Sequence, residues 1–344
     1  MEKNIFGLNK DELTAELSFL KLPAYRIGQI LEWIYRKDAA DFSVMSNLPK
    51  NLRVSLSERF CINRAEVLRE LVSADKLTAK FLLKVAPDVA VETVLMRHDY
   101  GNSLCVSTQA GCAMGCAFCA SAQNGLQRSL TTGEILAQLV FVQNFLQREG
   151  QKISTIVIMG MGEPLVNYDN VLKFIRLVHE PYALNLGYRN ITLSTSGIVP
   201  NIYRLAEENL PVNLAISLHA PTDELRSRLM PVNKKYPLVE LLAAGKLYGE
   251  RTKRRVTYEY ILIKGVNDSF DMARQLAKLM GGQLAAVNII PVNHVEEKGF
   301  LPPSPQRVAE FQKYLESRGV TATIRREMGA EVNAACGQLR GRWQ

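Results

Sequence analysis

Residues 107–125 of this chain read STQAGCAMGCAFCASAQNG and place Cys112, Cys116 and Cys119 in the spacing C-x3-C-x2-C. No fourth cysteine stands close by, although the chain has six. Three thiolates cannot complete a structural zinc site, which takes four protein ligands, and a ferredoxin-type cluster also takes four. The spacing therefore predicts a [4Fe–4S] cluster in which the protein holds three irons and the fourth is open to a small molecule.

Length and composition indicate a globular protein with a sizeable core. The chain has 344 residues, of which 47% are hydrophobic and 22% are charged. The net charge of +8 favours a polyanionic partner such as RNA, although many basic proteins bind no nucleic acid. The N-terminus lacks the apolar region of a signal peptide, and no apolar run has the length of a membrane span. We therefore expect a cytoplasmic protein with no membrane partner, whose reduced cysteines serve metal binding or catalysis.

Two different patterns occupy the first hundred residues. Three segments carry apolar residues at helical spacing, which predicts a helical accessory domain over residues 1–65. These segments are residues 10–22, 24–38 and 48–60. In residues 77–85 and 89–98, apolar and polar side chains alternate instead, and Ala-Pro-Asp separates the two segments. This pattern predicts a β-hairpin within an extension over residues 66–97.

From residue 103 onward, short apolar runs alternate with helical patterns. The runs are residues 103–109, 154–160, 190–196, 212–218, 256–263 and 285–292, with 320–327 as a late addition. Runs that are apolar almost throughout are typical of strands covered on both faces, as in parallel sheets. The first helical segment opens with Thr131 and Glu134 in the spacing of a capping box. The pattern predicts an α/β fold, either a barrel or an open doubly wound sheet.

The positions of the unusual residues favour the barrel. The cysteine motif follows the first run, and GMGEPL follows the second. STSG, SLHAP, KGVND and PVN follow the third to sixth runs in order. Barrels of this kind place their chemistry at the C-terminal ends of the strands. We therefore expect a partial (βα)6 barrel over residues 98–328, followed by a C-terminal segment over residues 329–344.

The cysteine motif, placed directly after the first strand of an α/β repeat, resembles that of the radical SAM superfamily. The resemblance implies that S-adenosylmethionine (SAM) binds the open iron and is cleaved to a 5′-deoxyadenosyl radical. It also implies a set of cofactor-binding residues at the strand ends. They are Glu163 and Pro164 toward the SAM amino group, and Ser194, Ser217, Leu218, His219 and Asn293 toward the carboxylate, ribose and adenine. From the residues alone, GMGE could be any tight turn and His219 a hydrogen-bonded structural histidine.

Further motifs narrow the resemblance to the family of RNA adenosine methylases that contains RlmN and Cfr. They are CVSTQAGCAMGCAFCAS, MGMGEPLVNYDNV, NLAISLHAP, SRLMPVNKKYP, IRREMG and AACGQLRG. The C2 and C8 carbons of adenine are not useful nucleophiles, so direct attack on the SAM methyl group is excluded chemically. The resemblance implies a fold with a radical SAM barrel and a route that uses two protein cysteines.

The resemblance assigns three catalytic residues. Cys336 is first methylated and then carries a methylene group to the base, and Cys105 releases the product through a transient disulfide with Cys336. Glu92 removes the proton from the adduct. From the pattern alone, either cysteine could be an inert buried thiol or a fourth cluster ligand. Glu92 stands on an apolar strand face as a candidate base, with an exposed strand glutamate as the alternative.

The function that the resemblance implies is formation of 2-methyladenosine in 23S rRNA at the peptidyl transferase centre, and in tRNA 3′ of the anticodon. The alternative is methylation of C8, which confers antibiotic resistance. Pro164 directly after Glu163 resembles the RlmN branch, since Cfr-type sequences have alanine at that position. A third reading is a non-catalytic, metal-containing RNA-binding module. We further expect two SAM molecules per turnover, an electron donor such as flavodoxin, a monomer, and RNA contact by the N-terminal helices.

Overall fold

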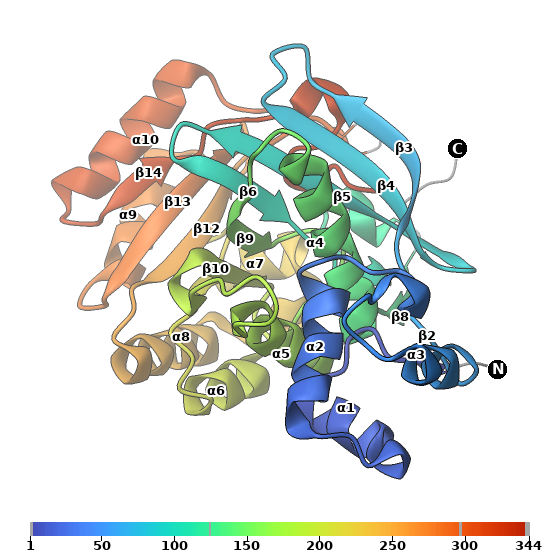
Figure 1. Cartoon of the computed structure of the whole chain (residues 1–344). Helices are drawn as coiled ribbons and strands as arrows, with labels where there is room; N and C mark the ends of the chain where they lie inside the picture. The colour runs from blue at the N-terminus through green and yellow to red at the C-terminus, as the bar shows by residue number, and fades with distance from the viewer. Residues whose placement is uncertain (1–2, 124, 296–297, 341–344) are drawn as a thin grey trace.

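The computed structural model describes residues 3–123, 125–295 and 298–340, so residues 341–344 of the predicted C-terminal segment lie outside the described part. The central sheet has ten strands in the order β14-β13-β12-β11-β10-β9-β6-β5-β4-β3 (Figure 1). The predicted runs form its parallel strands in the predicted order. These are β6 (Gly101–Cys105), β9 (Ile153–Ile158), β10 (Ile191–Thr195), β11 (Asn213–Ser217), β12 (Val256–Leu262), β13 (Ala285–Pro291) and β14 (Ala322–Ile324).

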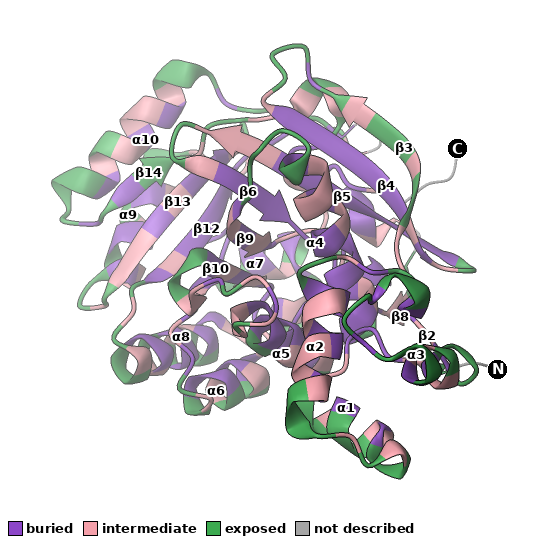
Figure 2. Cartoon of the chain, in the orientation of Figure 1, coloured by how far each residue is buried: buried purple, intermediate pink, exposed green. Residues whose placement is uncertain are grey.

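Helices separate these strands along the chain, and the fold is the predicted partial α/β barrel. They are α4 (Thr132–Gln147), α5 (Tyr168–His179), α6 (Val199–Glu207), α7 (Asp223–Leu229), α8 (Leu238–Thr252), α9 (Phe270–Met280) and α10 (Pro305–Ser317). In Figure 2 the strands are largely buried, whereas α6, α8 and α10 each show an exposed side. No helix within the described residues combines the length and the hydropathy that crossing a membrane requires. Because the strands are parallel, the loops after their C-terminal ends gather at one end of the sheet.

Antiparallel strands extend this sheet beyond β6. They are β3 (Glu66–Val72), β4 (Thr78–Ala86) and β5 (Val89–His98). The pair β4–β5 confirms the predicted hairpin, and β5 pairs with β6 so that Val94 lies opposite Cys105. The edge strand β3 was not predicted, because it is largely exposed and charged and lacks a buried apolar face. The hairpin residues therefore continue the sheet of the barrel.

The N-terminal residues form the predicted helical module. It contains α1 (Lys10–Glu16), α2 (Ala24–Tyr35) and α3 (Lys50–Ser57), with the short paired strands β1 (Lys3–Asn4) and β2 (Phe60–Cys61). Gly7 has a φ of +98°, and a Cβ atom there would lie 2.6 Å from the backbone nitrogen of Gly133 in α4. Glycine thus permits close contact between the module and the first turn of α4. The apolar side chains of the module and of the barrel form one continuous core.

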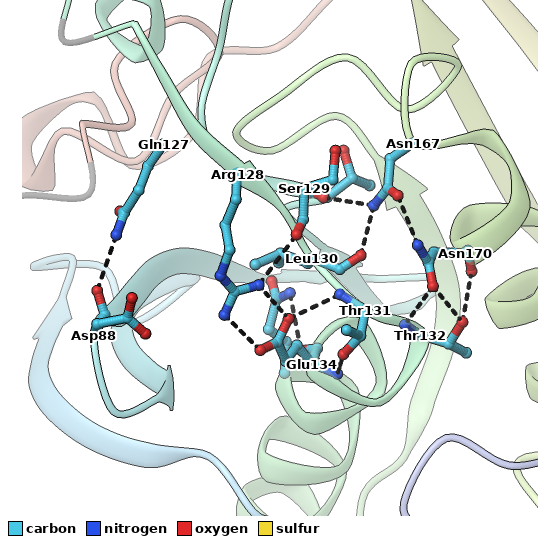
Figure 3. A network of polar contacts seen from close by, with 12 residues as sticks. Asp88, Gln127, Arg128, Ser129, Leu130, Thr131, Thr132, Glu134, Asn167 and Asn170 are labelled. Atoms are coloured by element: carbon cyan, nitrogen blue, oxygen red, sulfur yellow. Dashed lines mark hydrogen bonds and ion pairs between the residues drawn. The ribbon is translucent and has the colours of Figure 1, made fainter.

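A polar network fixes the chain where it leaves the cysteine motif (Figure 3). The motif lies between two short paired strands, β7 (Gln109–Gly111) and β8 (Leu126–Ser129). Arg128 donates to both carboxylate oxygens of Glu134, at 2.8 and 2.7 Å. Thr131 and Glu134 form the predicted capping box at the start of α4, and Asn167 donates to the Leu130 carbonyl oxygen at 2.7 Å. The exit of the cysteine loop is therefore tied to α4 and to the loop after β9.

Candidate active site

Two adjoining cavities are lined by residues at the C-terminal ends of the parallel strands. The larger has a volume of about 630 Å³ and the smaller of about 160 Å³. They share part of their lining, including Cys119, Met159, Gly160, Arg325 and Cys336. A molecule in one cavity would therefore contact some of the same side chains as a molecule in the other.

All three cysteines of the C-x3-C-x2-C motif line the smaller cavity. Between the last two, the backbone N–H of Ala117 donates to the carbonyl oxygen of Leu229 at 2.8 Å, which holds the loop against the end of α7. Burial raises the pKa of the Cys112 thiol to about 11, and it also raises the pKa values of Cys116 and Cys119. Without a bound cation, the site thus favours neutral thiols.

The donor set fits the predicted [4Fe–4S] cluster, because the three cysteines of the motif line one cavity. In a four-iron cluster each thiolate binds a different iron, so the ligands need only face a common cavity. A bound metal also favours the thiolate form that burial alone opposes. Cys112, Cys116 and Cys119 would therefore hold three irons, and SAM would bind in the remaining space of the site.

Glu163 lines the same cavity and is held by buried hydrogen bonds. Gly162 has a φ of +99°, and a Cβ atom there would lie 2.5 Å from Cβ of Gln109, so only glycine lets this turn pack so closely. The Gln109 side chain accepts the N–H of Glu163 at 2.8 Å. The Glu163 carboxylate accepts the Thr195 hydroxyl at 2.7 Å and the Ser196 N–H at 2.6 Å. Burial nevertheless raises its pKa, so a cationic group in the cavity would stabilise the carboxylate.

A buried arginine joins the ends of β10 and β11. Arg226 is fully buried and donates to the carbonyl oxygens of Ser196 at 2.7 Å and Ser217 at 2.9 Å. It also donates to the Asn233 side chain at 2.8 Å. Burial lowers the pKa of Arg226 to about 10, which leaves it charged at neutral pH. Its Nε donates to the carbonyl oxygen of Leu218 at 3.2 Å, so Arg226 fixes the backbone at Ser217 and Leu218, two of the residues predicted to contact SAM.

His219 combines a structural contact with a place in the cavity wall. Its Nδ1 accepts the N–H of Ile261 at 2.9 Å, and its ring lies edge-on to Phe118 with the centroids 4.8 Å apart. Burial, aided by the charge of Arg226, lowers the pKa of His219 to about 3. The imidazole is therefore neutral near pH 7 and lines the smaller cavity as an uncharged ring.

Cys105 and Cys336 both line the larger cavity, and Cys336 also borders the smaller one. The Asn293 side chain donates to the carbonyl oxygen of Cys336 at 2.9 Å. Burial and, to a smaller extent, the nearby Cys336 raise the pKa of Cys105 to about 12, although the Arg325 guanidinium opposes the rise. The same two thiols raise the pKa of Arg325. Two thiols and one guanidinium therefore interact in a shared site.

Glu92 lies beside this site and is only 7% exposed, so the alternative of an exposed strand glutamate is wrong. Its carboxylate lies 2.9 Å from Nζ of Lys80, which is also buried. The same Nζ donates to the carbonyl oxygen of Asn333 at 3.0 Å, and the N–H of Arg340 donates to Glu92. This charged pair therefore links β4 and β5 to the segment that carries Cys336.

Comparisons with known proteins agree with this arrangement. Residues 106–277 match the radical SAM superfamily, and residues 3–62 match the ribosomal RNA large subunit methyltransferase N-terminal domain. Two similar proteins are each described as a probable dual-specificity RNA methyltransferase RlmN. The one from Symbiobacterium thermophilum is 54% identical, over 98% of this chain and 91% of the relative. The one from Geobacillus kaustophilus is 48% identical, over 98% of this chain and 93% of the relative. The chain belongs to the RlmN family of radical SAM RNA methyltransferases. A solved radical SAM methyltransferase from Sphaerobacter thermophilus is 44% identical with a TM-score of 0.95, covering 99% of this chain and all of the other.

The structure brings together most of the residues that the resemblance to the RlmN family implied. The smaller cavity is lined by Cys112, Cys116, Cys119, Glu163, Ser194, Ser217 and His219, and the larger by Cys105 and Asn293, with Cys336 in both. Among the described residues that line them, neither cavity includes Glu92, Pro164 or Leu218. Pro164 and Leu218 are buried beside the lining residues Glu163 and His219.

Sequence reasoning missed several polar residues of this RlmN-family site. Lys80 and Arg226 stand in segments with other charges, where nothing local shows that they are buried. Arg325 stands next to Arg326 near the end of the chain, where nothing local distinguishes it from a solvent-exposed basic residue, yet it lines both cavities. Glu259 is a buried acid in the otherwise apolar β12 and lines the smaller cavity. An acid within an apolar strand run was a signal that could have identified Glu259.

Proposed function

We propose that this protein forms 2-methyladenosine in 23S rRNA at the peptidyl transferase centre and in tRNA at the adenosine 3′ of the anticodon. The observation that carries the proposal is the position of Cys336, which borders both the cavity of the three motif cysteines and the cavity that contains Cys105. A thiol placed between a SAM site and a second, larger cavity can accept a methyl group from one side and present it to a base on the other. The relatives' description as dual-specificity RNA methyltransferases supports the two RNA classes.

The cofactors would be a [4Fe–4S] cluster held by Cys112, Cys116 and Cys119, and SAM in the smaller cavity, used twice per turnover. When bound, they supply a methyl group and a radical that removes a hydrogen atom. Glu163 provides a carboxylate toward the SAM ammonium group, and Ser194, Ser217 and His219 provide polar and aromatic groups in the same wall. Asn293 lines the larger cavity and holds the Cys336 backbone, so its contact with SAM stays a prediction.

Cys336 and Glu92 would carry the bond-forming half of the reaction. The Cys336 sulfur takes a methyl group as a thioether, and after loss of one hydrogen atom its carbon bonds to C2 of the adenine. The adduct then loses the C2 proton, which Glu92 accepts, and one electron, for which the oxidised cluster, when bound, would be the acceptor. Since Glu92 is buried against Lys80, its carboxylate is held in one position beside the segment of Cys336.

Cys105 would complete the reaction. Its thiolate attacks the Cys336 sulfur, so a disulfide forms, the bond between that sulfur and the methylene carbon breaks, and the carbon takes the electron pair and a proton to become methyl. Two electrons from an external reductant then return the disulfide to two thiols. Arg325 stabilises the Cys105 thiolate that burial disfavours, because its guanidinium opposes the rise in the Cys105 pKa.

The remaining expectations concern partners and location. The net charge of +8 suits rRNA and tRNA, and the N-terminal helices would add RNA contacts. We expect a cytoplasmic monomer that receives electrons from a small carrier of the flavodoxin type.

Nucleoside mass spectrometry tests the proposal directly. The anaerobically reconstituted protein is incubated with SAM, a reductant and either an rRNA fragment or a tRNA, and the digested RNA is compared with authentic 2-methyladenosine and 8-methyladenosine. We expect 2-methyladenosine from both RNAs. Formation of 8-methyladenosine would replace the proposal with C8 methylation, and absence of any methyladenosine from a cluster-containing protein that binds RNA would support the non-catalytic reading.

A further inference from the structure

An exposed aromatic pair stands at the edge of the larger cavity. His98 ends β5 and pairs with Gly101 at the start of β6, so Asp99 and Tyr100 form the tip of this hairpin. The rings of His98 and Tyr100 stack, with centroids 4.6 Å apart and planes 8° from parallel. Tyr100 is 75% exposed, and both rings line the cavity that contains Cys105 and Cys336.

The hairpin itself does not explain a tyrosine at this position. Tight turns favour Gly, Asn, Asp, Ser and Pro for backbone reasons, and Tyr100 provides none of those advantages. The Tyr100 hydroxyl makes none of the hydrogen bonds found among the described residues. Its ring therefore presents one apolar face to His98 and the other to the cavity mouth or solvent.

Three arginines, Arg97, Arg325 and Arg326, and two acids, Asp99 and Glu327, line the cavity beside the pair. Arg325 and Arg326 line the same cavity, and both lower the pKa of His98 in addition to the larger effect of burial, while Asp99 opposes them. A lowered pKa keeps His98 neutral near pH 7, so the stack itself adds no charge. Neutral rings flanked by arginines suit a ligand that offers both a base to stack on and a phosphate to pair with.

We propose that Tyr100, supported by His98, stacks on a nucleobase next to the adenosine that enters the larger cavity. The inference rests on the proposed function, because an adenine that reaches Cys336 must leave the stack of its own strand. Its neighbour then exposes a face that an aromatic side chain at the entrance can cover. Arg326, which is exposed and lines the same cavity, would face phosphates of the same single-stranded RNA segment.

Fluorescence of a substituted RNA tests this proposal. 2-Aminopurine replaces the nucleotide on either side of the target adenosine, and the RNA is titrated with the cluster-containing protein at fixed salt. We expect quenching at one of the two positions with the wild-type protein and with Tyr100→Phe. Tyr100→Ala and Tyr100→Leu should lose that quenching, and their Kd should rise roughly 5-fold or more, as expected for the loss of one base–aromatic stack.

Phe270→Ala provides the matched control, since Phe270 is a 49% exposed aromatic residue on α9 that lines neither cavity among the described residues. It should retain both quenching and affinity. Thermal unfolding of each variant shows whether the fold is kept. Wild-type quenching and affinity in both Tyr100→Ala and Tyr100→Leu would overturn the stacking proposal alone. Failure of the wild-type protein to bind or methylate the RNA would instead overturn the proposed function.

Discussion

Cys105 and Cys336 carry the same thiol in surroundings that allow different movements. Cys105 ends a strand inside the sheet, where its carbonyl oxygen accepts the Thr93 hydroxyl at 2.6 Å. Cys336 lies in a turn of the C-terminal segment and is held through its carbonyl oxygen by Asn293. A turn adapts more easily than a central strand. The structure thus suits a mobile carrier at Cys336 and a fixed releasing thiol at Cys105.

Cys105→Ala is expected to trap a covalent adduct between protein and RNA, because on the proposed route the thioether at Cys336 then lacks the thiol that displaces it. Denaturing electrophoresis should show a slow band that contains both labelled RNA and protein. Cys336→Ala should give neither product nor band. Cys61→Ala is the matched control, since Cys61 lies in β2 and is not among the described residues that line either cavity, and this variant should turn over normally. A band in Cys336→Ala, or normal turnover in Cys105→Ala, would reverse the two roles.

Single alanine variants of Cys112, Cys116 and Cys119 should each contain much less iron than the wild-type protein after anaerobic reconstitution. On the proposed ligand set, loss of one of three thiolates would leave the cluster weakly anchored, so formation of 5′-deoxyadenosine from SAM should also be lost. Iron and sulfide analysis provides the primary measurement, with Cys61→Ala as the control. A variant with full iron content and normal SAM cleavage would remove that cysteine from the ligand set.

The element that shapes the active site most directly is the C-terminal segment, which crosses from β14 to the antiparallel strands β3 and β4. The N–H of Ala74 donates to the Glu331 carboxylate at 2.6 Å, and Lys80 donates to Asn333. On the barrel side, the Ser121 hydroxyl donates to the carbonyl oxygen of Leu339 at 2.7 Å. The segment of Cys336 is therefore held between strands β3 and β4 on one side and the cysteine loop on the other.

Lys80→Met should loosen this segment, because it removes the buried cation that contacts both Glu92 and Asn333. Breaking a buried ion pair costs roughly 3–5 kcal/mol, which urea unfolding would measure as lost stability. Limited proteolysis should cut residues 329–340 faster, and product formation should fall at least tenfold while iron content stays normal. Lys80→Arg, which keeps the charge, should recover part of both properties. Wild-type stability and turnover in Lys80→Met would show that the pair has no such role.

At the scale of the whole molecule, one sheet connects the parts that the reaction needs. Its parallel strands position the cysteine loop and Glu163, and its antiparallel strands position Glu92 and Lys80. The helical module shares its apolar core with the barrel. The net charge of +8 acts over this entire surface and gives RNA a sequence-independent attraction.

RNA binding should therefore weaken steeply with salt. Each phosphate contacted in a single strand releases counterions and adds roughly −0.7 to the slope of log K against log salt concentration. Fluorescence anisotropy over a fourfold range of salt would measure this slope, with sucrose at matched osmolality as the control. Affinity that is unchanged over this range would argue against RNA as the substrate.

The sequence by itself determined the order of the elements and predicted Cys112, Cys116 and Cys119 as the cluster ligands. Three local patterns made this possible: the strand runs, the Thr131–Glu134 capping box and the C-x3-C-x2-C spacing. Each depends on residues that are close together in the chain, so each can be recognised from the sequence alone. Because parallel strands bring their C-terminal ends together, strand order also predicted that Glu163, Ser194, Ser217 and His219 would meet.

Only the tertiary structure decided which groups are buried together across long separations. Lys80 meets Asn333 over 253 residues, and Ala74 meets Glu331 over 257, so neither contact leaves a local pattern. The same holds for Arg226. Its sequence neighbours suggest an exposed charged residue, whereas in the fold it is buried against the ends of β10 and β11. Burial is a property of the folded surroundings, and it changes a side chain's pKa, partners and reactivity without changing the sequence around it.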